Sequence, residues 1–230
     1  MEFCHYRIWL SRSHRIYELR YPADRMYRII TKSLKKETIK KMQQYGNLVR
    51  LLDVDPDFII ELVYATADNF TGSIVYDSPE CYIDVDTAKR LIIAKNLAKK
   101  DGYRMKVWDA FRPTSAQQRF WDLLPDNDFV AYPPDMETIT EFKNSHMNGQ
   151  CVDVTLTDMD GNDILMPSAF DDFTEKARLD CQTTSGEALK NATYLRDIMV
   201  RAGFSPYSGE WWHFYDRNSV PVRYTETIPR

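Results

Sequence analysis

The sequence predicts an α+β fold, a single domain with a central antiparallel sheet flanked by helices. Three observations support this fold class. Helical patterns come first and strand-like runs are interleaved with later helices, unlike the regular strand–helix repeat of a doubly wound sheet. Asp160-Gly161 separates two strand-like runs and predicts a hairpin, whose strands pair antiparallel. The chain has 230 residues, 43% of them apolar, which is enough for one sizeable core.

The charge of the chain is unevenly distributed. Residues 1–50 carry 12 Lys or Arg against 4 Asp or Glu, a net charge of +8, and the remainder carries −12. Such a basic arm can bind nucleic acid or an anionic membrane. This arm also contains Tyr, Ile, Leu and Trp and shows no recognition motif, so we expect no nucleic-acid partner. We divide the chain into a basic N-terminal extension, 1–50, packed on a body, 51–230.

The first half of the chain contains one clear helix. Residues 26–50 have the pattern of one or two basic amphipathic helices, Pro56 marks a turn before a short apolar run, and residues 65–80 form a loop ending in a strand or hairpin. The clear helix spans residues 84–102, with Asp86 or Thr87 as its N-terminal cap and Gly102 after its end. Its apolar face consists of Leu91, Ile92, Ala94, Leu97 and Ala98.

The second half of the chain alternates strands and helices. Residues 103–111 alternate as in a strand, and a helix follows that begins after Pro113 and ends before Pro125. A long connection separates this helix from the hairpin. A further helix ends at Gly203, and an aromatic strand completes the pattern. The ranges are 126–144 for the connection, 151–165 for the hairpin, 185–203 for the helix and 210–216 for the last strand.

The sequence shows no export or membrane signal. No run of about 18 apolar residues occurs, so we expect no membrane insertion. The segment 1–20 lacks the uninterrupted apolar stretch of a secretory signal. The cysteines are widely spaced and form no CxxC pair, which favours free thiols in a reducing compartment. We therefore expect a cytoplasmic protein. The cysteines are Cys4, Cys81, Cys151 and Cys181.

Two short motifs could together form a metal site. His146 precedes Asp153 by seven residues, and Glu210 and His213 form an E-x-x-H pair. Catalytic zinc usually has three protein ligands and leaves the fourth position to water or substrate. His146, Asp153 and His213 satisfy that count, and Glu210 then remains as a general base. Each motif alone is more often structural, because a histidine in an aromatic strand usually packs against its neighbours.

Strand geometry limits how these residues can meet. Successive side chains of a strand point to opposite faces, so Glu210 and His213 share a site only if the strand bulges or begins after Glu210. The odd spacing of His146 and Asp153 places at least one of them outside regular strand. Asn148-Gly149 offers the turn that would redirect His146.

Four separate motifs carry a resemblance to a known family. In order and spacing, over about residues 60–215, the chain resembles the VanX-type D-alanyl-D-alanine dipeptidases, a branch of the zinc D,D-peptidases with a shared α+β fold. The matching motifs are Y-A-T-x-D-N-F-T-G at residues 64–72, W-D-x-[YF]-R-P at 108–113, S-H-x-x-G-x-x-x-D at 145–153 and E-W-W-H at 210–213.

The resemblance implies a role for each matched residue. It implies that one Zn²⁺ is bound by His146, Asp153 and His213, and that Glu210 activates the attacking water. It implies that Arg112 stabilises the oxyanion, a role that suits a planar group that is always charged. It also implies three substrate contacts. These are Asp171 (with Asp172 as the other register) for the substrate amine, Tyr64, and Ser145.

The resemblance implies hydrolysis of the small dipeptide D-Ala-D-Ala, for antibiotic resistance or for recycling of a cell-wall precursor. The alternative is a D,D-carboxypeptidase that removes terminal D-Ala from peptidoglycan stem peptides. A non-catalytic metal-binding module on this fold is disfavoured, because such a module would be expected to lack Glu210 or Arg112. Assembly into a homo-oligomer is allowed, but no feature of the sequence requires it.

Some positions near the motifs leave a choice open. Asn144 and Met147 depart from the pattern of relatives beside His146, which leaves the dipeptide preference open. Asp68 and Asn69 lie in the first motif, where turn chemistry explains them as well as substrate binding does. Cys151 shares a strand face with Asp153, and we expect a packed thiol there instead of a fourth zinc ligand.

Overall fold

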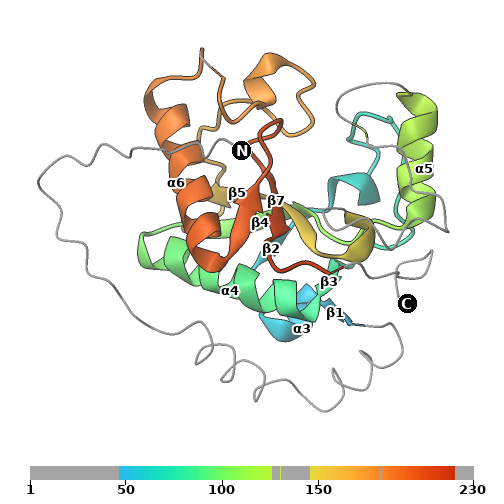
Figure 1. Cartoon of the computed structure of the whole chain (residues 1–230), viewed down its shortest axis with the longest axis horizontal. Coiled ribbons are helices and arrows are strands. Elements are labelled where there is room, and N and C mark those ends of the chain that lie inside the picture. The colour runs from blue at the N-terminus through green and yellow to red at the C-terminus, as the bar shows by residue number, and fades with distance from the viewer. Residues whose placement is uncertain (1–46, 126–129, 131–145, 182, 221–230) are drawn as a thin grey trace, which may run out of the picture. The chain divides into compact units, whose positions relative to one another are not determined.

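A five-stranded sheet lies at the centre of the computed structural model, which describes residues 47–125, 130, 146–181 and 183–220 (Figure 1). These residues belong to one compact unit of the chain, Leu34–Arg230. The strand order is β2-β4-β5-β7-β6, in which β2 and β4 are parallel and the other neighbours antiparallel. The strands are β2 (Ile59–Ile60), β4 (Arg104–Asp109), β5 (Cys151–Thr157), β6 (Phe204–Pro206) and β7 (His213–Asp216).

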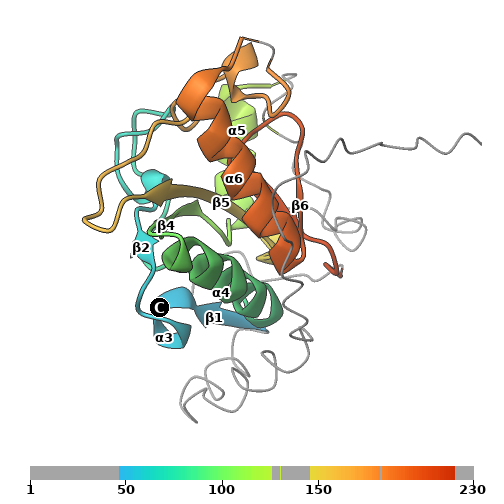
Figure 2. The ribbon, with the colours of Figure 1, turned by 90° about the vertical axis from the view of Figure 1, so that its left-hand side faces the viewer.

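Two long helices, α4 (Val85–Lys100) and α6 (Gly186–Ala202), contact each other and cover one face of this sheet. Figure 2, viewed from that side, shows both helices in front of β4 and β5. The predicted α+β fold with a largely antiparallel sheet flanked by helices is confirmed. None of the described helices combines the length and the apolar character that crossing a membrane requires.

The side chains of β7 show which sheet face these helices cover. Asp216 accepts hydrogen bonds from Thr87 Oγ1 (3.1 Å) and Arg90 Nε (2.9 Å), both on α4. Because strand side chains alternate, Phe214 faces α4 as Asp216 does, and His213 faces the opposite side. Phe214 is fully buried and pairs with Val152 of β5, which is also fully buried. Part of the apolar core therefore lies between this face of the sheet and the two helices, and His213 lies on the opposite face.

The N-terminal cap of α4 differs from the prediction. The cap is Asp84, whose carboxylate accepts the backbone N–H groups of Asp86 and Thr87. The prediction of Asp86 or Thr87 as cap was wrong because the helix begins earlier, at Val85, directly after the short strand β3 (Tyr82–Asp84). The predicted end of the helix before Gly102 is confirmed, since α4 ends at Lys100.

A second, two-stranded sheet pairs β1 (Leu48–Arg50) antiparallel with β3. The prediction of helix over residues 26–50 is therefore wrong at residues 48–50, and residues 26–46 lie outside the described part of the chain. A short helix, α3 (Leu51–Val54), follows β1 directly. Leu48 and Val49 are buried, so this small sheet adds to the apolar core.

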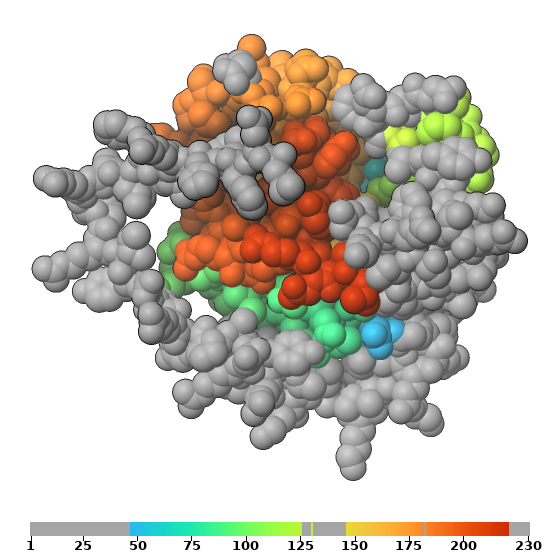
Figure 3. All heavy atoms as spheres, viewed as in Figure 1, coloured from blue at the N-terminus to red at the C-terminus, as the bar shows by residue number. Residues whose placement is uncertain are grey.

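Helix α5 (Thr114–Leu123) begins after Pro113 and ends before Pro125, as predicted. Phe120 on its inner face is buried, and its ring lies 4.6 Å from the ring of Tyr64 and 5.1 Å from that of Phe70. Figure 3 shows the atoms of α5 at one side of the molecule, with teal atoms of the 62–76 segment deeper between α5 and the red β7 region. This helix therefore packs on the loop that carries Tyr64.

Three predicted strands are missing or shorter in the structure. The hairpin after β5 keeps only an isolated bridge between Thr157 and Asp163, because Asp158 instead organises the turn by accepting the N–H groups of Asp160 and Asn162. Residues 65–80 contain no strand, and only their predicted loop is confirmed. The predicted aromatic strand is shorter than residues 210–216, since β7 begins at His213.

The C-terminal caps of α4 and α6 provide a matched stability test. Gly102 and Gly203 both have positive φ, 87° and 103°, which costs an L-residue about 1–2 kcal/mol. An added Cβ would meet nothing within 4 Å at Gly102, but would lie 3.1 Å from Arg90 Nη1 at Gly203. We expect Gly203→Ala to lower the free energy of unfolding in urea more than Gly102→Ala does, because it also displaces Arg90 from Asp216. Equal losses would contradict this role of Arg90.

Candidate active site

Three acidic and imidazole side chains form a row across three neighbouring strands. Asp109 of β4 pairs with Asp153 of β5, and Asp153 pairs with His213 of β7. A bulge between Val107 and Asp109 shifts the register at the end of β4. Asp153 and His213 lie on the face that α4 and α6 leave uncovered, and Asp109 meets them from the strand end. The sequence analysis included Asp153 and His213 in the site but missed Asp109.

His146 reaches this row from a turn, as the odd spacing to Asp153 required. It begins a 3-10 helix, η3 (His146–Asn148), which Gly149 ends with φ of 70°. The Nδ1–H group of His146 donates to the carbonyl oxygen of Ala110 (2.8 Å). This bond fixes the ring, so that Nε2 faces Asp153 Oδ2 at 3.3 Å and His213 Nδ1 at 3.2 Å.

The three side chains fit a zinc ion by donor type and by spacing. One ligand atom from each of His146, Asp153 and His213 lies within 4.8 Å of the others, and His213 Nδ1 is 3.0 Å from Asp153 Oδ1. Tetrahedral zinc with bonds of about 2.0–2.1 Å places its ligand atoms about 3.3 Å apart. Only the two imidazole nitrogens match that spacing with single atoms, at 3.2 Å, because a different oxygen of Asp153 faces each histidine, at 3.0 and 3.3 Å. Cys151 is buried on the same strand but is not part of this group.

Glu210 lies beside this group because the last strand begins late. β7 starts at His213, so the alternation of a strand does not apply to Glu210, and its Oε2 is 3.8 Å from His213 Nδ1. This is one of the two arrangements that the sequence analysis required for an E-x-x-H pair. Burial raises the pKa of Glu210 to about 7; the nearby His213 opposes this shift and the charge of Asp153 adds to it.

Asp171, which lies in a loop, has the second carboxyl group whose pKa is raised. Burial raises its pKa to about 7, and the charge of Asp153 adds to the shift. The Tyr64 hydroxyl contacts both carboxylate oxygens, at 3.0 and 3.1 Å. Asp171 has a φ of 56°, a strained conformation for a non-glycine residue. A cation bound between His146, Asp153 and His213 would oppose both pKa shifts, because a nearby positive charge stabilises a carboxylate.

Arg112 lies after the end of β4 and is held by Asp109. Its Nε and Nη2 donate to Asp109 Oδ2 at 3.0 and 2.7 Å, and Nη1 donates to Gln117 Oε1 at 2.8 Å. The other oxygen of Asp109 accepts from Tyr76 Oη (2.7 Å) and from the backbone N–H of Ala110 (2.9 Å). Asp109 is fully buried, and these donors compensate its charge.

The structure distinguishes the predicted substrate residues from their neighbours. Asp171, not Asp172, is the residue that contacts Tyr64. Asn69 serves the turn, since its side chain donates to the carbonyl oxygens of Thr66 and Ser73 and accepts from Thr71. Ser145 lies outside the described residues. Gln117 and Tyr76 were missed, because each acts through another side chain and matches no spacing rule.

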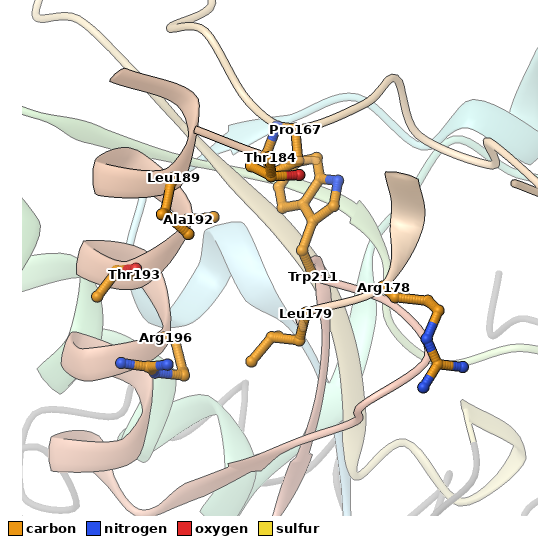
Figure 4. A pocket seen from close by; sticks show the side chains of 9 residues that line it. All are labelled: Pro167, Arg178, Leu179, Thr184, Leu189, Ala192, Thr193, Arg196 and Trp211. Carbon is orange, nitrogen blue, oxygen red and sulfur yellow. The ribbon is translucent and has the colours of Figure 1, made fainter. Parts of the chain in front are cut away.

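A pocket lies beside this site, between α6 and the segment before it (Figure 4). None of the predicted site residues lines it. Trp211, which follows Glu210, points into it, and its Nε1 donates to Ser168 Oγ at 2.9 Å. The indole therefore anchors the chain next to Glu210. The lining residues are Pro167, Arg178, Leu179, Thr184, Leu189, Ala192, Thr193, Arg196 and Trp211.

Comparison with known proteins identifies the family. A peptidase M15 model described as D-Ala-D-Ala dipeptidase matches residues 44–229. The chain belongs to this family. Among curated D-Ala-D-Ala dipeptidases, that of Escherichia coli strain K12 is 34% identical over 173 residues, covering 75% of this chain and 86% of the relative. That of Enterococcus faecium is 35% identical over 170 residues, covering 67% of this chain and 84% of the relative.

Solved structures show a more distant similarity. The VanY D,D-pentapeptidase from a VanB-type cassette, an E175A mutant in complex with Zn(II), has a TM-score of 0.38 and 18% identity. That match covers 62% of this chain and 77% of the other. The LD-carboxypeptidase LdcB has a TM-score of 0.37 and 19% identity, covering 60% of this chain and 61% of the other.

The ligand geometry predicts which changes remove a metal ion from this D-Ala-D-Ala dipeptidase family member. We expect His213→Ala to lose bound zinc, because two ligands alone hold the ion weakly. Cys151→Ala is the matched control and should retain zinc, since the thiol is outside the ligand group. Elemental analysis of the purified proteins measures both. Full zinc content in His213→Ala would remove His213 from the ligand set.

Proposed function

We propose that the protein is a zinc-dependent dipeptidase that hydrolyses D-Ala-D-Ala. The observation that carries this proposal is the convergence of His146, Asp153 and His213 next to Glu210. Membership of the D-Ala-D-Ala dipeptidase family and the names of the curated relatives support it. The body of the chain, residues 51–230, is then the catalytic domain. Residues 1–50 are an extension whose last three residues, Leu48–Arg50, pair with β3 of that domain.

In this proposal, His146, Asp153 and His213 hold one Zn²⁺. The ion would supply Lewis acidity, which can polarise a carbonyl and acidify water. Glu210 accepts a proton from the attacking water, whose oxygen bonds to the carbonyl carbon. Glu210 then gives the proton to the leaving nitrogen as the C–N bond breaks. The side chain of Glu210 is 14% exposed, so its carboxyl can take up and release this proton next to the substrate.

Arg112 stabilises the negative charge that develops on the carbonyl oxygen. An arginine has five N–H groups, and the contacts with Asp109 and Gln117 use three of them. The remaining two make no hydrogen bond to the described residues and can donate to the oxyanion. Because these donors are already oriented, little reorganisation is needed as the charge forms.

Asp171 binds the substrate ammonium in this proposal, with the Tyr64 hydroxyl alongside. Ser145 contributes a further substrate contact. A charged amine beside a buried carboxylate favours a free dipeptide over a stem peptide, whose corresponding nitrogen is an uncharged amide. A D,D-carboxypeptidase is therefore the alternative that the substrate test must exclude.

We also propose a cytoplasmic location. Three cysteines in the described part of the chain, Cys81, Cys151 and Cys181, are free thiols. Free thiols of this kind are typical of a reducing compartment. A cytoplasmic enzyme would act on the dipeptide before it enters the cell-wall precursor.

The role of Glu210 predicts a separation of metal binding from catalysis. We expect Glu210→Gln to retain zinc and to lower kcat for D-Ala-D-Ala by about 10³-fold, within the range for loss of a general base. Glu187→Gln, an exposed position on α6, is the matched control and should keep wild-type activity. Wild-type activity in Glu210→Gln would exclude the mechanism proposed here.

The role of Asp171 predicts a change in substrate binding. We expect Asp171→Asn to raise KM for D-Ala-D-Ala by about 10- to 100-fold, the cost of losing a hydrogen bond between charged partners. The neighbouring Asp172→Asn is the control and should leave KM unchanged. Steady-state kinetics on D-Ala-D-Ala and on an N-acetylated tripeptide measure both variants and the wild type. Faster cleavage of the blocked peptide by wild type would favour the carboxypeptidase.

A further inference from the structure

Asp109 holds the Arg112 guanidinium by one atom. Both Nε and Nη2 donate to the same oxygen, Oδ2, because the other oxygen is occupied by Tyr76 and the Ala110 N–H. A bidentate pair with two carboxylate oxygens would fix the orientation of the guanidinium plane. Two bonds to a single oxygen instead act as a pivot, about which the group can rotate within its own plane.

Aromatic rings restrict motion out of that plane. The guanidinium carbon of Arg112 lies 5.4 Å from the ring centre of Tyr64 and 4.9 Å from that of Phe120. Contacts of this kind are attractive through the ring quadrupole. They oppose displacement of the guanidinium away from the rings. A flat ring face, however, does not favour any one orientation of the guanidinium within its own plane. The pivot at Asp109 therefore leaves one degree of freedom that these contacts do not fix.

Gln117 supplies the missing constraint. Its Oε1 accepts from Nη1, the nitrogen that Asp109 does not contact, at 2.8 Å. Gln117 is 3% exposed and lies on α5. The helix is itself anchored to the neighbouring loop, since Arg119 donates to Ser73 Oγ (2.6 Å) and to the carbonyl oxygen of Ile74 (3.2 Å). A second fixed acceptor at the opposite nitrogen prevents rotation about Asp109 Oδ2.

We propose that Gln117 is a positioning residue for Arg112. It sets the in-plane orientation in which the two remaining N–H groups face the oxyanion. Its amide oxygen is an uncharged acceptor. It therefore orients the guanidinium without adding another negative charge, besides that of Asp109, next to the positive charge of Arg112. This inference rests on the proposed function, in which Arg112 stabilises the transition state.

Gln117→Met tests the inference, because methionine has a similar length and helix propensity but no oxygen acceptor. We expect kcat for D-Ala-D-Ala to fall about 10- to 100-fold, as for a displaced catalytic group, while KM changes by less than about twofold. Zinc content should be unchanged. Gln118→Met is the matched control, since it removes an exposed hydrogen bond to Asp122 from the same helix and should keep wild-type kinetics.

A spectroscopic measurement separates positioning from a structural role. The Arg112 Nε–H signal in a ¹⁵N–¹H spectrum, identified by its loss in Arg112→Lys, should shift or broaden in Gln117→Met and stay unchanged in Gln118→Met. Gln117→Leu also lacks the acceptor and replaces Gln117→Met if thermal unfolding shows that the latter is not folded. An unchanged Arg112 signal, an unchanged kcat or an effect confined to KM would overturn the inference.

The two proposals fail in different ways. If the wild type does not hydrolyse D-Ala-D-Ala, the proposed function is wrong. The Arg112 signal still decides whether Gln117 orients the guanidinium, since that measurement requires no substrate. If the wild type is active and Gln117→Met matches it in kcat and in the Arg112 signal, only the positioning role is wrong.

Discussion

The burial of several carboxylates around one point is the constraint on which the rest of the site depends. Asp109 and Asp153 are 0% and 3% exposed, and Asp171 and Glu210 lie close enough to Asp153 for its charge to raise both pKa values. Burying an uncompensated charge costs several kcal/mol, so each carboxylate requires a partner. Asp109 has Arg112, Tyr76 and a backbone N–H. Burial raises the pKa of Asp171 and of Glu210, and the charge of Asp153 adds to both shifts. A metal ion or a substrate ammonium bound nearby would oppose both pKa shifts.

The sheet separates these charged side chains from the apolar side chains that lie under α4 and α6. Val152 and Phe214 pair on the face under α4 and α6, and Asp153 and His213 pair one residue further along on the other face. A shift of one residue in the pairing of β5 with β7 would exchange the two sets, burying the charges against α4. The ion pair of Arg90 with Asp216 links β7 to α4. Packing on one face thus fixes the geometry on the other, and the ligands need not hold the sheet in register themselves.

The sequence predicted the helices that have a regular apolar period and the residues that belong to a motif. It did not predict contacts that depend on the direction in which a side chain points. The apolar period located α4, α5 and α6, and the motifs named the residues that meet at the site. The same reasoning placed a helix where Leu48–Arg50 is a strand and missed Asp84 as a cap, because a short strand preceding a helix has no period of its own. Asp109 and Gln117 were left out of the predicted site for another reason. Each acts through Arg112, and neither periodicity nor spacing shows that a residue acts by holding another side chain.

In the proposed function, charge recognition is what selects so small a substrate. A pocket that accepts or rejects a single methyl group discriminates by only about 1–3 kcal/mol, and D-Ala offers little more than a methyl group. A buried carboxylate left without its partner costs more than that. Asp171 meets this requirement, because it is held by Tyr64 in a strained loop conformation and burial already raises its pKa. An acylated amine would bring no charge to it and would leave it with the Tyr64 hydroxyl as its partner. If Asp171 binds the substrate ammonium as proposed, selection against longer peptides would follow from this charge pairing.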